Sequence, residues 1–145
     1  QMDAALTKIL DAQPRIAVTG LNPHSGEGGL LGMEEVDEIQ PAIVEARHMG
    51  MNVQGPIPAD IVFVRALRGE FDGVVCMYHD HANTARKLQP AESGATLYMG
   101  LPVIGTTTAH GTAYEIAGRG VADPGSMTAA LHFAIQLAVG TCQEV

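Results

Sequence analysis

The chain has 145 residues, 46% of them hydrophobic, which suits one domain with a buried core and argues against disorder. Its formal net charge of −8 at pH 7 argues against a nucleic acid or an anionic membrane as partner, because both attract a basic face. The two cysteines, Cys76 and Cys142, form no C-x-x-C pair, which suits a reducing cytoplasm, and no apolar stretch approaches the length of a membrane span.

Hydrophobic spacing and helix-breaking residues predict alternating helices and strands in the first part of the chain. A helix is predicted over Met2–Leu10, and a short buried strand over Arg15–Leu21. A second helix is predicted over Glu34–Met49, where Pro41 should cause a kink or break near Gln40.

The middle of the chain begins with a stiff segment, because the prolines of Gly55–Pro58 fix their own φ and push the preceding residues toward extended backbone. A short helix over Ala59–Leu67 follows. We expect Ile61, Val64 and Leu67, or the neighbours of Leu67, to point inward.

The second half contains further apolar runs, separated by glycines and a long irregular stretch at 108–125. The predicted elements are a strand at Phe71–Tyr78, a short helix at His79–Lys87, strands at Ala95–Leu101 and Val103–Thr107, and a last helix at Met127–Val139 with Ser126 as its N-cap. Strands that alternate with helices indicate an α/β domain with a largely parallel sheet.

Two histidines follow predicted strands directly. His24 lies in the glycine-rich loop 21–32, L-N-P-H-S-G-E-G-G-L-L-G, and His79 comes directly after an apolar strand. Open α/β sheets bind ligands at the carboxyl ends of their strands, so both imidazoles and the carboxylates of Asp60 and Asp80 are candidates for one metal site. On spacing alone, two unrelated surface histidines remain an equal alternative.

Cofactor binding has a weaker signal. A Rossmann fingerprint is absent, because Leu31 stands where G-x-G-x-x-G needs its third glycine. The loop at 109–118 is punctuated by glycines and enters a helical turn, whose free N–H groups suit a nucleotide; a plain surface loop is the alternative. Lys87 is a candidate for proton exchange or for pairing with a substrate anion, against the alternative of a solvated lysine.

Five motifs together carry a resemblance to a known family. They read L-N-P-H-S-G-E-G-G, G-P-I-P-A-D, M-Y-H-D, M-G-L-P and H-G-T-A-Y-E-I-A-G-R-G, and they run in register from Arg15 to the last helix. In these motifs the chain resembles the C-terminal part of 4-hydroxythreonine-4-phosphate dehydrogenases. The resemblance implies that residues 1–145 form a single α/β region of a longer two-domain dehydrogenase. The implied fold is a three-layer α/β/α fold like that of isocitrate and isopropylmalate dehydrogenases, which bind NAD(P) without a Rossmann domain.

The resemblance also implies roles for individual residues. His24 and His79 match two of three histidines that hold a divalent metal (zinc, magnesium, manganese or cobalt), and the third lies upstream of residue 1. The family shares this site across a homodimer. The remaining matches are Asp60 and Lys87 as catalytic residues, Lys87 and Thr96 as substrate contacts, and His110, Gly111, Thr112 and Ala113 as binding residues for NAD or NADP.

The expected function is therefore oxidation of a secondary alcohol of a small hydroxy acid, with decarboxylation, in pyridoxine biosynthesis. Three departures from the family pattern leave the substrate open. The chain reads H-D-H-A at 79–82 where the family commonly has H-D-Q-G, Thr96 stands where the family has a substrate-binding asparagine, and Gly105 stands where it has a substrate-binding arginine. The alternatives are a phosphorylated sugar acid and a cis-dihydrodiol of an aromatic dicarboxylate. An alternative of another class is a non-catalytic metal-binding or assembly module. We expect the chain alone to be inactive, because the upstream ligand is missing.

Overall fold

A computed structural model describes residues 1–90 and 94–139 of the chain. The described chain divides into two compact units, residues 2–85 and residues 86–139 with Gln1. The elements of the first unit are α1 (Met2–Leu10), β1 (Arg15–Thr19), η1 (Ser25–Gly29), η2 (Glu35–Ile39), α2 (Gln40–His48), β2 (Asn52–Ile57), α3 (Ala59–Leu67), β3 (Gly73–Val75) and the start of α4 (His79–Lys87). The second unit contains β4 (Ala95–Tyr98), β5 (Gly105–Thr108), η4 (Tyr114–Ile116) and α5 (Gly125–Val139).

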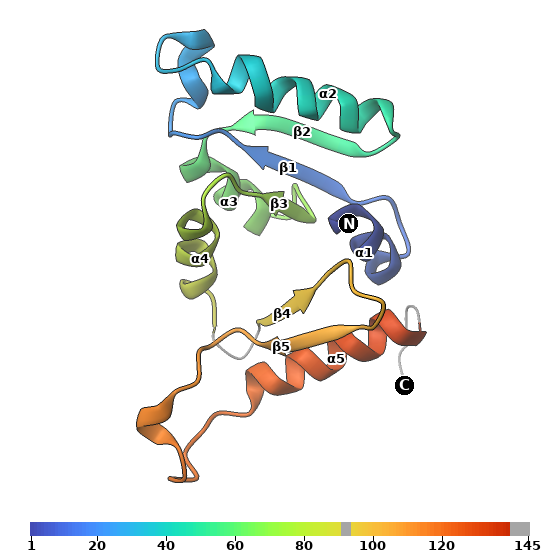
Figure 1. Cartoon of the computed structure of the whole chain (residues 1–145), viewed down its shortest axis with the longest axis vertical. Coiled ribbons are helices and arrows are strands. Elements are labelled where there is room, and N and C mark those ends of the chain that lie inside the picture. Colours follow the sequence, from blue (N-terminus) through green and yellow to red (C-terminus); the bar gives the residue numbers. More distant parts are fainter. Residues whose placement is uncertain (91–93, 140–145) are drawn as a thin grey trace. The chain divides into compact units, whose positions relative to one another are not determined.

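The first unit is built on a three-stranded parallel sheet with the order β2-β1-β3 (Figure 1). Ile16 of β1 pairs with Val53 of β2 and with Gly73 of β3. Parallel strands need crossover connections, which α2 supplies between β1 and its neighbour β2, and α3 supplies from β2 to β3 on the other side of β1. The α/β fold with a parallel sheet is confirmed.

Helices cover both faces of this sheet, because successive side chains of β1 point to opposite sides. Ile16 and Val18 pack in one buried cluster with Ile43 of α2. Ala17 packs in a second cluster with Val62 of α3. The first unit therefore has three layers, with the core divided between the two faces of the sheet.

At the predicted kink or break near Gln40 the helix changes type and its backbone stays helical. Glu35–Ile39 forms a π-helical turn, and the α-helix begins at Gln40. Pro41 lies in the first turn of α2, where its missing N–H would have no partner within the helix.

The prediction that Ile61, Val64 and Leu67 form the buried face of α3 is wrong. Ile61, Val64 and Leu67 are 48%, 45% and 65% exposed, whereas Ala59 and Val62 are buried. Both faces of this helix are apolar, so the periodicity could not show which one meets the sheet.

The stiff segment is extended as expected, because residues 55–57 lie in strand β2, whose pairing with β1 shifts register between Ala17 and Thr19. The other strands differ from the predictions. Of the strand expected at 71–78, only Gly73–Val75 forms a strand, which pairs with β1. Strands β4 and β5 pair with each other in antiparallel fashion, because the connection at 99–104 is too short for a crossover.

The N-cap expected at Ser126 is also wrong. Helix α5 begins at Gly125, whose N–H donates to a carboxylate oxygen of Asp123 at 2.7 Å. The hydroxyl of Ser126 is buried and makes other contacts, given below. In the part of the chain that the structure describes, no helix is both long and apolar enough to cross a membrane.

Candidate active site

The carboxyl ends of the three parallel strands share one edge of the sheet, and the candidate residues follow these ends. His24 comes five residues after β1, Asp60 is the second residue of α3 after β2, and His79 opens α4 after β3. All three side chains are exposed. The parallel topology thus places the segments that carry them at the same edge, where α/β sheets bind ligands.

Hydrogen bonds connect the three strand ends. Thr19, which is fully buried, accepts a bond from the N–H of Met77 at 3.0 Å on its hydroxyl oxygen, and this joins the exit of β3 to the end of β1. The N–H of Gly20 donates to the carbonyl of Ile57 at 2.9 Å, which joins β1 to the end of β2. The segments that leave the sheet toward His79 and Asp60 are therefore anchored on β1.

The loop that carries His24 is held by two side chains. The amide oxygen of Asn22 accepts the N–H of His24 at 2.9 Å and that of Gly26 at 3.3 Å. The buried Glu35 carboxylate accepts the N–H of Leu21 at 2.7 Å. Its second oxygen lies close to Gly26, so close that a Cβ at residue 26 would sit 2.7 Å from it. The loop is thus packed against a buried carboxylate that the sequence analysis did not single out.

Each imidazole already has one polar neighbour. Nδ1 of His24 lies 2.8 Å from Oε1 of Glu27, so Nε2 is the nitrogen available to a further ligand. Nε2 of His79 lies 2.6 Å from the amide nitrogen of Asn83, one helical turn along α4. A cation bound through that nitrogen of His79 would have to displace Asn83.

The described residues contain no group of three or more His, Cys, Asp or Glu side chains arranged to hold a metal ion. The Cys76 side chain is half-buried, and burial raises the pKa of its thiol. Within this chain, the candidate ligands for a cation are the two histidines with the carboxylates near them.

The residues expected to bind substrate and cofactor fall in or near the second unit. Lys87 is the exposed last residue of α4. The hydroxyl of Thr96 on β4 donates to the carbonyl of Thr108 on β5 at 3.4 Å. In the 110–113 loop, Nδ1 of His110 lies 2.8 Å from the carbonyl oxygen of Gly111, next in the chain.

The 110–113 loop is connected to α5 and β4 through Ser126. The hydroxyl of Ser126 accepts the N–H of Ala109 at 2.9 Å and donates to the carbonyl of Gly94 at 2.6 Å. Ala113 then takes the left-handed conformation at φ 49° before the short turn η4. The N-terminal side of the loop is therefore fixed, while Gly111 and Thr112 are exposed.

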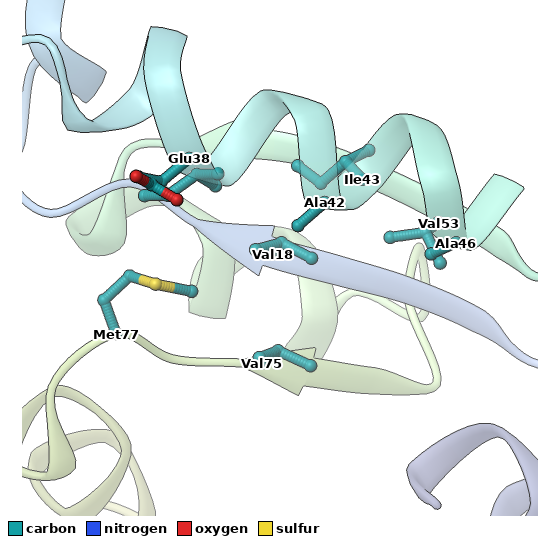
Figure 2. A pocket seen from close by; sticks show the side chains of 9 residues that line it. Val18, Glu38, Ala42, Ile43, Ala46, Val53, Val75 and Met77 are labelled. Carbon is teal, nitrogen blue, oxygen red and sulfur yellow. The ribbon is translucent and has the colours of Figure 1, made fainter.

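Figure 2 shows an apolar pocket of about 390 Å³ on the sheet face beneath α2. Val18 and Val75 form its floor, Ile43 lies opposite, and Met77 closes one end beside the Glu38 carboxylate. Among the described residues that line the pocket, Glu38 is the one with a charged side chain. The pocket's nearest link to the candidate site is Met77, two residues before His79.

Two acidic residues of the site were missed in the sequence. Glu35 stands four and eight residues before the core positions Ile39 and Ile43, and an acid on the buried face of a helix is a usable signal. Glu27 stands three residues after His24 in a glycine-rich loop, where no helical or strand periodicity predicts a contact.

The model of the pyridoxal phosphate biosynthetic protein PdxA family matches residues 1–134. The chain belongs to this family. It is 51% identical over 126 residues to a putative 4-hydroxythreonine-4-phosphate dehydrogenase 2 of Rhizobium meliloti, covering 87% of this chain and 36% of that protein. It is 52% identical over 126 residues to a putative D-threonate 4-phosphate dehydrogenase of Oceanobacillus iheyensis, covering 86% of this chain and 38% of that protein.

Solved structures agree with this membership. The 4-hydroxythreonine-4-phosphate dehydrogenase of Klebsiella pneumoniae aligns with a TM-score of 0.81 and 42% identity, over 94% of this chain and 41% of that one. A terephthalate 1,2-cis-dihydrodiol dehydrogenase of Burkholderia xenovorans aligns with a TM-score of 0.65 and 30% identity, over 99% of this chain and 44% of that one. The chain thus spans well under half the length of the relatives it matches, and the resemblance stated from its motifs is confirmed.

Proposed function

We propose that this PdxA-family chain forms the metal-binding part of a dehydrogenase that uses NAD or NADP and a divalent cation to oxidise a small hydroxy acid. The observation that carries the proposal is the position of His24 and His79 beyond the carboxyl ends of two adjacent parallel strands. The hydrogen bond between Thr19 and Met77 holds these strand exits together. The proposal explains why two imidazoles follow neighbouring strands in a family of dehydrogenases.

The donor set fits a divalent cation. Imidazole nitrogens suit zinc and cobalt, and the carboxylates of Asp60 and Asp80, which follow strands of the same sheet, would broaden the choice toward magnesium and manganese. His24 and His79 would hold the ion, and a third ligand would come from outside this chain. When bound, the cation lowers the pKa of the substrate hydroxyl and stabilises negative charge on oxygen.

The protein's own residues supply proton transfer and substrate binding in this proposal. Asp60, in the first turn of α3, accepts the hydroxyl proton of the substrate. Lys87 pairs with the substrate's anionic group or returns a proton to the product. Thr96 contributes its hydroxyl to the substrate from β4. A product that is a β-keto acid would then lose carbon dioxide.

The cofactor is proposed to bind at the loop of His110, Gly111, Thr112 and Ala113. The exposed backbone of Gly111 and Thr112 offers N–H groups to the phosphates of NAD or NADP. Ser126 fixes the start of the loop through Ala109, which limits the entropy lost when the nucleotide binds. The active assembly is proposed to be a homodimer that shares the metal site.

We propose a phosphorylated hydroxy acid as the substrate class, because relatives about 50% identical are named for such substrates. A dihydrodiol of an aromatic dicarboxylate is the second candidate. It is favoured by the uncharged Gly105 and by the likeness to the dihydrodiol dehydrogenase of Burkholderia xenovorans. A panel of both classes, assayed by nicotinamide absorbance on the chain completed to the length of its relatives, decides between them.

Zinc titration of the chain tests the metal site. His24→Ala and His79→Ala should each weaken zinc binding at least tenfold, because each removes a ligand. His48→Ala, at the exposed end of α2, is the matched control and should bind zinc as the wild type does. Unchanged zinc affinity in both ligand variants would contradict the proposal.

Nucleotide titration separates the dehydrogenase from a metal-binding or assembly module. NAD or NADP should raise the melting temperature of the chain in the presence of zinc, since a ligand that binds only the folded state stabilises it. Gly111→Pro should reduce that rise, because proline removes an N–H from the loop. A rise with zinc but none with either nucleotide would favour the module.

A further inference from the structure

The contact between His24 and Glu27 is the starting point. Nδ1 of His24 lies 2.8 Å from Oε1 of Glu27, across the first turn of η1. Both side chains are about half exposed, at 59% and 47%. An exposed ion pair of this kind contributes little to folding stability, so stability gives only a weak reason for a carboxylate at residue 27.

The backbone conformation at residue 27 argues against a glutamate at this position. Glu27 adopts φ 45° and ψ 49°, the left-handed conformation, between Gly26 at φ 73° and Gly28 at φ 66°. A Cβ makes this conformation sterically unfavourable, whereas glycine adopts it readily. A non-glycine residue in such a conformation points to a functional role for its side chain.

We infer that Glu27 is a positioning residue for the metal ligand His24. Its carboxylate accepts the Nδ1–H of the imidazole, which fixes the tautomer whose lone pair is on Nε2 and restrains rotation of the ring. A histidine that binds a metal through one nitrogen characteristically donates its other N–H to such an acceptor, and loss of the acceptor costs about 10–100-fold in metal affinity. The inference rests on the proposed role of His24 as a ligand.

Other side chains hold the backbone of the loop that carries His24 and Glu27. Asn22 holds the backbone N–H groups of His24 and Gly26. The buried Glu35 lies behind Gly26, on the other side of the loop from solvent. The backbone that carries both partners is therefore fixed, so the carboxylate of Glu27 is presented to the imidazole by the fold.

Two substitutions separate this role from a structural one. Glu27→Gly removes the carboxylate and relieves the backbone, so the metal-free chain should melt at the same temperature or higher. Zinc affinity should nevertheless fall about 10–100-fold. Glu27→Gln keeps an acceptor oxygen and should lose clearly less. Glu34→Gln, which neutralises an exposed carboxylate at the start of the next helical turn, controls for charge and should bind zinc as the wild type does.

The nitrogen-15 spectrum of the imidazoles tests the tautomer without any metal. At about pH 8, where an ordinary histidine is neutral, His24 should carry its proton on Nδ1 in the wild type and in Glu27→Gln. In Glu27→Gly it should shift toward the Nε2–H form that free histidine prefers. A merely structural Glu27 would leave this signal unchanged.

Three results would overturn the inference. The first is an unchanged His24 tautomer in Glu27→Gly, and the second is wild-type zinc affinity in that variant. The third is a loss in Glu27→Gln as large as in Glu27→Gly, because Glu27 would then be a direct ligand. If the proposed function is wrong, the results differ from these. His24→Ala would then bind zinc as tightly as the wild type does, while the nitrogen-15 spectrum would still show whether Glu27 sets the tautomer of His24.

Discussion

Gly26→Ala is expected to destabilise the first unit by about 3 kcal/mol. Residue 26 has φ 73°, where an L-residue costs about 1–2 kcal/mol. The new Cβ would lie 2.7 Å from the carboxylate of the buried Glu35 and 3.2 Å from the carbonyl of Gly32. Steric crowding of this kind destabilises the folded state by roughly 1–3 kcal/mol more. Alanine also reduces the conformational entropy of the unfolded chain, and this offsets only about 0.4–1 kcal/mol of the loss.

Gly28→Ala is the matched control, because residue 28 has φ 66° but no atom within 4 Å of the position its Cβ would take. It carries the backbone cost alone, about 1 kcal/mol. Thermal unfolding followed by circular dichroism should show a drop of roughly 6–12 °C for Gly26→Ala and roughly 2–4 °C for Gly28→Ala. Equal drops in the two variants would refute the argument that Glu35 packs against residue 26.

Four further substitutions test the fold. Arg15 holds the pKa of Asp72 at about 2, against an ordinary 3.8, so the stability from this pair is present above about pH 4 and is lost as the pH falls toward 2. Asp72→Asn should therefore melt lower at neutral pH and with a flatter acid dependence, measured as melting temperature against pH. Val62→Ala should cost about 2 kcal/mol by chemical denaturation because Val62 is fully buried, whereas the half-exposed Val64→Ala should cost less than about 0.5. Ser126→Ala should cost about 1–3 kcal/mol in the same assay, because it leaves a backbone N–H without its partner; a neutral result would contradict the bridge seen in the structure.

Local chemistry in the sequence determined several features that the structure confirms. Pro41, which has no N–H to donate, marks the point where the π-helical turn at Glu35–Ile39 gives way to the α-helix that starts at Gln40. The apolar run at Arg15–Thr19, followed by a glycine loop, marked the central strand of the parallel sheet. The order of strands and helices then placed His24 and His79 after strands of one sheet, and the five motifs identified the family.

Tertiary structure alone decided which of two apolar faces of α3 is buried, because Val62 and Val64 are equally hydrophobic and only the sheet distinguishes them. It also decided the pairing of β2, whose ladder bonds come from β1, more than thirty residues earlier in the chain. The contact of Glu27 with His24 depends on a left-handed backbone that the surrounding loop imposes. Periodicity reports the neighbours that a residue has along its own helix or strand. The first two features depend on partners that are distant in the sequence, and the third depends on a backbone conformation that no periodic pattern predicts.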